Sequence, residues 1–222
     1  MNEIPCTDAH THCLPEDPSI LACVNLPFET EKLPAEGKNY LFSLGIHPAE
    51  SLKENGFALL RKSVQRFPSL SAIGECGLDK NVPVAMEKQK ALFLRQAELA
   101  EELKKPLIVH CVKAWDILYD CAKRFPAKGR KWLIHSFRGN FSLAQELVRH
   151  SFTLSLAPPL IRTMPERAAQ MRELPFLLET DDAQEDLKEL FVLAAKSCKI
   201  PGEELKKRVR TLFGAFFQLD TL

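Results

Sequence analysis

The residues best suited to chemistry are histidines and carboxylates that recur at the ends of short apolar runs. Six of them form the candidate set: His10, His12, Glu75, His110, His135 and Asp181. Imidazole and carboxylate groups together bind zinc, manganese, iron or magnesium. This set therefore predicts a metal site assembled from segments that are far apart in the chain.

The pair His10 and His12 is the most informative part of this pattern. Side chains at positions i and i+2 of a strand point to the same side, so both rings can reach one ion. Six ligands are too many for one tetrahedral zinc and suit two ions that share a carboxylate and a water. Glu75 is the natural bridge because a carboxylate has two oxygens. Asp8 either orients a ligand histidine from behind or caps a turn.

Eight apolar runs are expected to be strands, and helical patterns lie between most of them. The expected strands are Ile4–Asp8, Ile20–Leu26, Tyr40–Gly45, Leu70–Gly74, Leu107–His110, Lys131–His135, Phe152–Leu156 and Phe176–Glu179. The expected helices are Phe57–Phe67, Val84–Lys104, Trp115–Phe125, Leu143–His150, Pro165–Met171, Glu185–Cys198 and Gly202–Phe217. This alternation predicts an α/β protein with a parallel sheet and crossover helices.

Eight strands predict a (β/α)8 TIM barrel that forms one domain over residues 1–222, and a single barrel of this kind starts at roughly 200 residues. The connections after the first two strands look too short or irregular for full helices, so these two βα units are expected to be trimmed. Chemistry in such barrels lies at the C-terminal ends of the strands. Five of the six histidines fall there, His47 among them, whereas His150 is placed in a helix.

Composition limits the class of protein. The chain has 30 basic and 29 acidic residues, so any contact with a polyanion must come from a local basic patch. Its seven cysteines form no C-x-x-C pair, which indicates free thiols in a reducing compartment. Residues Met1–Ile4 do not look like a signal peptide, and no stretch approaches the roughly 20 apolar residues of a membrane span. We expect a cytoplasmic protein with no membrane association and no obligate protein partner.

The order of the motifs resembles that of a known family. Asp8-Ala9-His10-Thr11-His12 is similar to the opening D-x-H-x-H of the TatD-type deoxyribonucleases, within the amidohydrolase-like metal-dependent hydrolases. Five further motifs follow in the family's order: Gly45-Ile46-His47-Pro48, Ala72-Ile73-Gly74-Glu75-Cys76-Gly77-Leu78-Asp79, Lys105-Pro106-Leu107-Ile108-Val109-His110, Ile134-His135-Ser136-Phe137-Arg138-Gly139 and Leu177-Leu178-Glu179-Thr180-Asp181. Six motifs in the right order, over residues 8–181, are a specific signal.

The resemblance implies a barrel with two divalent metal ions (Mg, Mn or Zn) and hydrolysis of DNA or another phosphodiester, in the manner of an exonuclease. His10, His12 and Asp181 would hold one ion, and His110 and His135 would hold the other. Glu75 would bridge the two ions. Two positions depart from the family. Val112 stands where an arginine is common, and Ala49 stands where a second histidine is common.

The expected mechanism uses a water activated by the two metals. Asp181 is expected to accept a proton, with Glu75 as the bridging carboxylate. His47 contacts phosphate or protonates the leaving group, or else makes only a loop hydrogen bond. Lys113 and Arg138 are the cations nearest the metal-bearing strand ends and are expected to bind substrate phosphates.

Two other functions are compatible with the same residues. A metal-dependent deacylase, lactonase or amide hydrolase would use the same centre on a carbonyl carbon, because fold does not fix substrate. The absence of an arginine at Val112 keeps that alternative open. A catalytically silent binding barrel is the third, and the complete ligand set argues against it.

Overall fold

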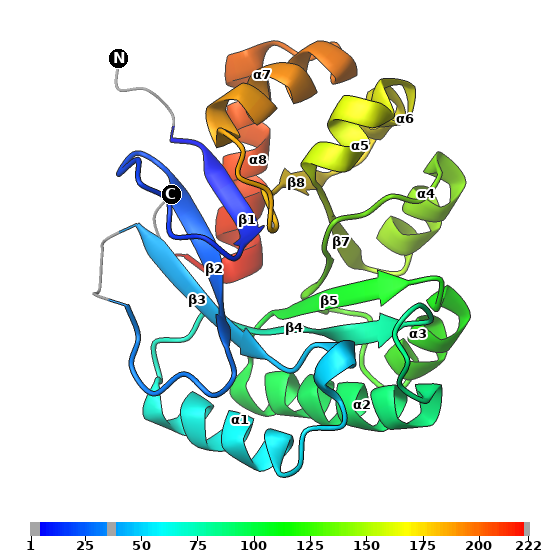
Figure 1. Cartoon of the computed structure of the whole chain (residues 1–222). Helices are drawn as coiled ribbons and strands as arrows, with labels where there is room; N and C mark the ends of the chain where they lie inside the picture. The colour runs from blue at the N-terminus through cyan, green and yellow to red at the C-terminus, as the bar shows by residue number, and fades with distance from the viewer. Residues whose placement is uncertain (1–4, 35–38, 220–222) are drawn as a thin grey trace.

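Eight parallel strands form the centre of the molecule and lie side by side in their sequence order (Figure 1). The computed structural model describes residues 5–34 and 39–219. The strands are β1 (Thr7–Thr11), β2 (Leu21–Pro27), β3 (Tyr40–Gly45), β4 (Ala72–Asp79), β5 (Leu107–Val112), β6 (Trp132–Ile134), β7 (Phe152–Leu156) and β8 (Phe176–Leu178). Most of their residues are buried, and outside β1 they are mainly apolar, as expected of parallel strands that are covered on both faces.

The sheet closes on itself where the chain leaves β8 and meets β1. The Asp181 N–H donates to the carbonyl of His10 at 3.0 Å, and the His12 N–H donates to the carbonyl of Asp181 at 3.0 Å. Beneath this seam, the Asp8 carboxylate accepts hydrogen bonds from the Thr180 N–H (3.0 Å) and hydroxyl (2.6 Å). The predicted barrel is therefore confirmed, and its closing seam carries three of the candidate metal ligands.

Helices surround the strands (Figure 1). They are η1 (Pro48–Glu50), α1 (Gly56–Arg66), α2 (Met86–Leu103), α3 (Trp115–Ala122), α4 (Phe141–Arg149), α5 (Pro158–Thr163), α6 (Pro165–Gln170), η2 (Met171–Glu173), α7 (Leu187–Cys198) and α8 (Gly202–Phe217). In the described residues between β1 and β2, and between β2 and β3, there is no helix, so the first two βα units are trimmed as predicted. Among the described residues, no helix is long and apolar enough to cross a membrane.

Strand boundaries differ from the prediction at the sites that matter most. Ile4 lies outside the described residues; β1 begins at Thr7 and runs through His10, so this histidine lies within the strand. Strand β4 continues to Asp79, five residues beyond the predicted end at Gly74, and Glu75 is therefore within the strand as well. His10 and Glu75 are consequently held by strand backbone on both sides.

Gly74 and Gly77 lie inside β4 and do not end it. A Cβ atom at Gly74 would lie 2.6 Å from the carbonyl oxygen of Ile108, and one at Gly77 would lie 1.9 Å from that of His110. Only glycine allows β4 to approach β5 this closely. These residues therefore bring Glu75 towards His110 and do not interrupt the strand.

Two helix predictions also need correction. His150 is the residue that caps the C-terminus of α4 and is not inside the helix. Helix α5 was missed because its two prolines look like breakers, yet they occupy the first turn, where proline lacks no needed hydrogen bond.

Candidate metal centre

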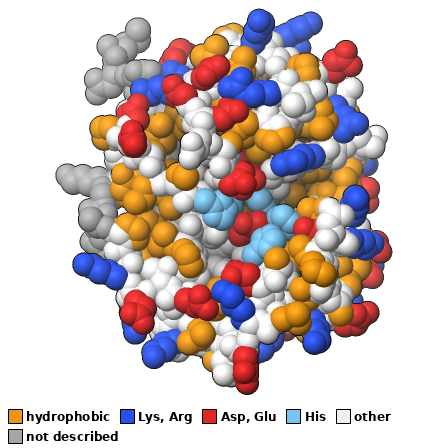
Figure 2. Space-filling model, in the orientation of Figure 1, with side chains coloured by type: hydrophobic (Ala, Val, Ile, Leu, Met, Phe, Trp, Pro, Cys, Tyr) orange, Lys and Arg blue, Asp and Glu red, His pale blue; other side chains and the backbone are white. Residues whose placement is uncertain are grey.

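The site lies at the C-terminal end of the barrel, around the Glu75 carboxylate. Oxygen Oε2 is 3.5 Å from Nε2 of both His10 and His12. Oxygen Oε1 is 2.8 Å from Nδ1 of His110 and 2.8 Å from Nε2 of His135. One carboxylate thus faces two histidine pairs, one pair on each oxygen. In Figure 2 the histidines surround a hollow near the middle of this face, with acidic side chains among them.

Asp181 completes the side of the site that holds the first pair. Its Oδ1 is 3.9 Å from Nε2 of His10 and 3.8 Å from Nε2 of His12. The residue follows β8 with φ of 59°, in the left-handed region, which directs its carboxylate from the seam towards the histidines. The structure therefore brings all six predicted ligand candidates together.

His47 is closer to this cluster than the sequence suggested. Its Nε2 is 3.6 Å from Oε1 of Glu75, and its ring packs edge-on against His110 with centroids 4.5 Å apart. Its Nδ1 accepts a hydrogen bond from the Ala49 N–H at 3.2 Å, which caps η1. The loop hydrogen bond considered from the sequence is present, and the second nitrogen still faces the site.

Three groups of side chains could each hold one ion, because their ligand atoms lie within 4.8 Å of one another. They are His10 with His135 and Asp181; His10 with His12 and Glu75; and His47 with Glu75 and His110. His47 is thus a geometrically available ligand that the sequence analysis did not include. The cluster has room for more than one arrangement of ions.

A carboxylate stands behind His110. Nε2 of His110 lies 3.2 Å from Oδ2 of Asp79, opposite the nitrogen that faces Glu75. Asp79 is itself fixed, because its backbone N–H and carbonyl are both bonded to the Gln89 amide and its Oδ1 accepts from the Asn81 N–H at 2.7 Å. Histidines that bind metals usually donate their other N–H to such a partner. In the sequence, Asp79 could either brace the site or shape the loop, and the geometry shows that it braces the site.

A second carboxylate stands behind His135. Nδ1 of this ring lies 3.3 Å from Oε1 of Glu179, which is fully buried. The Ser136 N–H donates to the same oxygen at 2.6 Å, and the Ser155 hydroxyl donates to the other oxygen. In the sequence, Glu179 is the expected end of a strand and part of a family motif, with no role of its own assigned. The missed signal was a charged residue inside an apolar run, because acids are almost never buried without partners.

Asp8 supports the seam and does not contact a histidine ring. Besides its two bonds with Thr180, it accepts from the backbone N–H of His10 at 3.3 Å. Burial raises the pKa of Asp8 to about 7, although the hydrogen bonds from Thr180 lower it. Asp8 therefore positions the backbone that carries His10.

The charge state of the centre follows from its neighbours. Burial opposes ionisation of Glu75, but the surrounding histidines, His135 first, hold the pKa of its carboxyl well below the ordinary value. Burial lowers the pKa of His47, which favours its neutral ring. An ionised carboxylate among imidazoles is a donor set for a divalent cation.

His10 shows whether the residues of this site fit a metal ion. The residue is fully buried, yet neither of its ring nitrogens has a hydrogen-bond partner among the described residues. Buried polar atoms are normally bonded, and leaving one without a partner is costly. Since Nε2 of His10 faces Glu75 and Asp181, a divalent metal ion held by these residues would supply the missing partner. The residues present therefore fit a divalent metal.

Lys113 and Arg138 lie where the sequence predicted, beside the metal-bearing strand ends. Both line a cavity of about 500 Å³ that also includes His110, His135 and Asp181. Lys113 Nζ lies 3.3 Å from the side-chain oxygen of Asn81. Both cations are exposed, so they are accessible to a ligand that approaches the centre.

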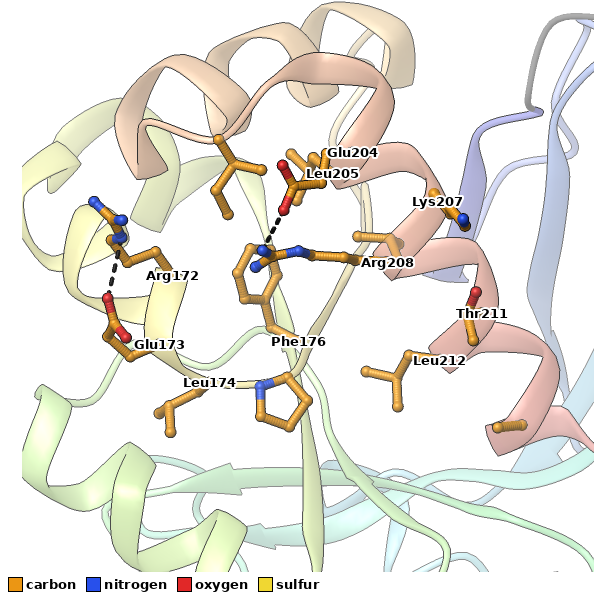
Figure 3. Close-up of a pocket in the computed structure, with 14 residues that line it drawn as sticks. Arg172, Glu173, Leu174, Phe176, Glu204, Leu205, Lys207, Arg208, Thr211 and Leu212 are labelled. Atoms are coloured by element: carbon orange, nitrogen blue, oxygen red, sulfur yellow. Dashed lines mark hydrogen bonds and ion pairs between the residues drawn. The ribbon is translucent and has the colours of Figure 1, made fainter.

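A different cavity, of about 600 Å³, lies between the start of β8 and α8 (Figure 3). Its lining includes Phe176 and Leu212, and its rim includes Arg208, which is paired with Glu204. It borders the beginning of β8, whereas Asp181 follows the end of that strand, and no histidine or cysteine lines it. Its chemistry is that of an apolar groove, so the candidate reaction centre is confined to the other end of the barrel.

Comparison with known proteins gives a consistent result. The family model described as TatD related DNase matches residues 26–196. The 3'-5' ssDNA/RNA exonuclease TatD of Klebsiella pneumoniae is 29% identical over 173 residues, which cover 73% of this chain and 65% of that protein. Human deoxyribonuclease TATDN3 is 31% identical over 155 residues, which cover 62% of this chain and 56% of that protein.

The matched regions do not extend over the whole of these relatives. The human 3'-5' RNA nuclease TATDN2 is 29% identical over 153 residues, which cover 63% of this chain but only 19% of the relative. The chain thus spans between about a fifth and two thirds of the length of the curated relatives it matches. In the solved structure of YJJV, a TatD homolog from Escherichia coli, the fold matches with a TM-score of 0.80 at 19% identity, over 96% of this chain and 98% of that one.

Proposed function

Because the chain belongs to the TatD related DNase family, we propose that it is a single-domain, metal-dependent phosphodiesterase that trims the ends of nucleic acid strands. The observation that carries this proposal is the position of Glu75, whose two oxygens face two different histidine pairs. This is the arrangement of a carboxylate shared by two ions. Relatives that are named as nucleases on DNA or RNA support the choice of a phosphodiester substrate.

The centre is proposed to hold two divalent ions, drawn from Mg, Mn and Zn. His10, His12 and Asp181 would hold one ion and His110 and His135 the other, with Glu75 between them. When bound, such ions polarise phosphoryl oxygens and lower the pKa of water. The chain's own contribution is to fix His10, Glu75 and His110 within strands and to keep the buried carboxylate ionised.

Asp181 is the proposed proton acceptor. It lies in the hollow at the end of the last strand, and its carboxylate is partly exposed, whereas that of Glu75 is almost fully covered by histidines. A general base needs to reach a water as well as the site. Asp181 meets both conditions, and Glu75 is then left to hold the ions.

His47 is proposed to donate a hydrogen bond to a phosphate oxygen. Its Nδ1 accepts from the Ala49 N–H, so in the neutral ring the proton resides on Nε2, the nitrogen that faces the site. A protonated Nε2 is a poor metal ligand and a good donor to an anion. This tautomer favours phosphate contact over coordination of an ion, and over protonation of the leaving group, which needs a charged ring.

The test uses protein that has been stripped with chelator and reloaded with Mg, Mn or Zn. Single-stranded oligonucleotides labelled at the 3' or the 5' end, as DNA and as RNA, are assayed beside carboxylic ester and lactone substrates. We expect metal-dependent release of mononucleotides from one end. Ester hydrolysis without nucleotide release at any metal concentration would instead favour a carbonyl hydrolase.

A further inference from the structure

The hollow above the metal centre divides into two lobes of about 500 Å³ each. They share His110, His135 and Asp181, so both reach the same ions. The first, the β2/β3 lobe, extends past Asn25 and η1, and the second, the β5/β6 lobe, extends past the turns that follow β5 and β6. A substrate longer than one nucleotide must enter one lobe, the other, or both.

The charges of the two lobes are opposite. Among the described residues, the β5/β6 lobe is lined by Lys113 and Arg138 and by no carboxylate other than the shared Asp181. The described lining of the β2/β3 lobe has no lysine or arginine and adds Asp182 to the metal-site acids, together with Glu50, which is paired with Lys53 at 2.7 Å. Because a cleft of one sign concentrates ions of the other sign, a polyanion is drawn to the β5/β6 lobe and repelled from the β2/β3 lobe.

The two cations of the β5/β6 lobe are not neutralised by acids. Within the described part of the chain, the Arg138 guanidinium has no ion-pair partner, and Lys113 contacts only the neutral side chain of Asn81. Some other exposed cations of this protein are paired, as Arg162 is with Glu185 at 2.7 Å. Unpaired guanidinium and ammonium groups at a cavity wall are suited to phosphate oxygens.

The same lobe contains an aromatic surface. Trp115, the first residue of α3, is partly exposed and lines the cavity. Behind it lies Phe137, which is 1% exposed, with the two ring centroids 6.2 Å apart and the planes inclined by 61°. A Cβ atom at Gly139 would lie 2.5 Å from the Phe137 ring, so glycine is needed for this packing. The indole is thus held from behind while it borders the cavity, where a base can stack on it.

We propose that the β5/β6 lobe binds the end of a single polynucleotide strand, with Lys113 and Arg138 on its phosphates and Trp115 against a base. The acidic β2/β3 lobe takes no strand, so the reacting phosphodiester lies close to the strand's end. This inference rests on the proposed function, and it names the surface that makes the enzyme act on ends. The chemistry is shared by DNA and RNA.

Binding is measured by tryptophan fluorescence, because the chain has only two tryptophans and Trp132 is 2% exposed. Metal-loaded protein is titrated with cleavage-resistant phosphorothioate oligothymidylate and oligouridylate. We expect saturable quenching that disappears in Trp115→Phe while the Trp132 signal stays. Trp115→Ala, which removes the aromatic ring altogether, should weaken binding about tenfold, within the range known for base stacking on aromatic side chains.

The cations are tested by the salt dependence of the same binding. The double variant Lys113→Ala/Arg138→Ala should reduce the slope of log K against log salt by about 1.4, which is two phosphate contacts at roughly 0.7 each for a single strand. Lys62→Ala removes an exposed lysine on α1 that has no ion-pair partner among the described residues, and it serves as the matched control. We expect the control to keep the slope and affinity of the parent protein.

The outcomes separate this proposal from the proposed function. Quenching and salt dependence as expected, with no cleavage of oligonucleotide or of bis(p-nitrophenyl) phosphate, would support the lobe and contradict the hydrolase. Cleavage of oligonucleotide with no Trp115 quenching and an unchanged slope in the double variant would overturn the lobe and leave the hydrolase in place. A circular dichroism spectrum of each variant verifies that it is folded.

Discussion

The two histidine pairs of the metal centre are supported in different ways. Behind His110 and His135 stand buried carboxylates, Asp79 and Glu179, at 3.2 and 3.3 Å. Among the described residues, the rings of the first pair, His10 and His12, have no such carboxylate behind them. They are positioned through backbone, by the β1–β8 seam and the Asp8 carboxylate beneath it.

This difference indicates two ways of preparing a metal site. A ring with a carboxylate 3.2 or 3.3 Å behind it, as His110 and His135 have, has its tautomer and its orientation favoured before any ion arrives. A ring that is held only by its strand keeps its direction but not its tautomer, and His10 accordingly has unpartnered nitrogens. We therefore expect the His110/His135 side to bind its ion more tightly than the His10/His12 side.

The largest effect should come from Glu75→Gln, because this side chain touches both pairs. Loss of the shared negative charge should remove both ions, and the several kcal/mol that bound metals contribute to a phosphoryl transition state correspond to about a thousandfold in rate. Metal content by elemental analysis and nucleotide release measure the two effects. Glu98→Gln, an exposed acid on α2, is the control. A variant that keeps two ions would show that the pairs do not share Glu75.

The second largest effect should be a pH dependence of stability that arises from Asp8, beneath the seam between β1 and β8. Since burial raises the pKa of Asp8 from its ordinary value to about 7, the folded protein keeps a proton that the unfolded chain loses between about pH 4 and 7. Stability should therefore fall as pH rises from about 4 to 7, by up to roughly 4 kcal/mol from this group. Urea denaturation of metal-free protein across this range, with Asp8→Asn beside it, measures the contribution.

Asp8→Asn should flatten that pH dependence, because the amide does not titrate and still bonds with Thr180. An identical profile in the variant and the parent would mean that Asp8 does not keep its proton in the fold. The seam between β1 and β8 could then not explain why the His10/His12 side binds its ion less tightly.

The third prediction compares the carboxylates behind the rings. Glu179→Gln and Asp79→Asn should each weaken metal binding by about 10- to 100-fold, as expected for partners of ligand histidines. Calorimetric titration with Mn²⁺ or Zn²⁺ should show the change in the tighter of two binding steps only. Asp116→Asn, an exposed acid paired with Lys80, is the control. A change confined to the weaker step would reverse the assignment of strong and weak sides.

Much of this site could be predicted from sequence because its ligand residues have unusual types for their positions. Histidines at strand ends and the two-residue spacing of His10 and His12 are visible without coordinates. The sequence left two roles open for Asp79 and gave none to Glu179, because their roles depend on which ring each one meets across the sheet. The extension of β4 through Glu75 was missed for a related reason: Gly74 and Gly77 are required by the close approach of β5, which is a tertiary contact.

The smallest effect should come from Asn25, which supports Glu75 without favouring either pair. Its side-chain oxygen accepts from the Glu75 N–H at 2.8 Å and from the Ser43 hydroxyl at 3.1 Å. Asn25→Ala removes a neutral acceptor and should cost about 0.5–1.5 kcal/mol of stability. Because Glu75 faces both pairs, the two metal-binding steps should weaken by the same small factor. If only one of the two metal-binding steps weakened, Asn25 would support only one histidine pair. Glu75 would then not be shared equally between the two differently supported pairs.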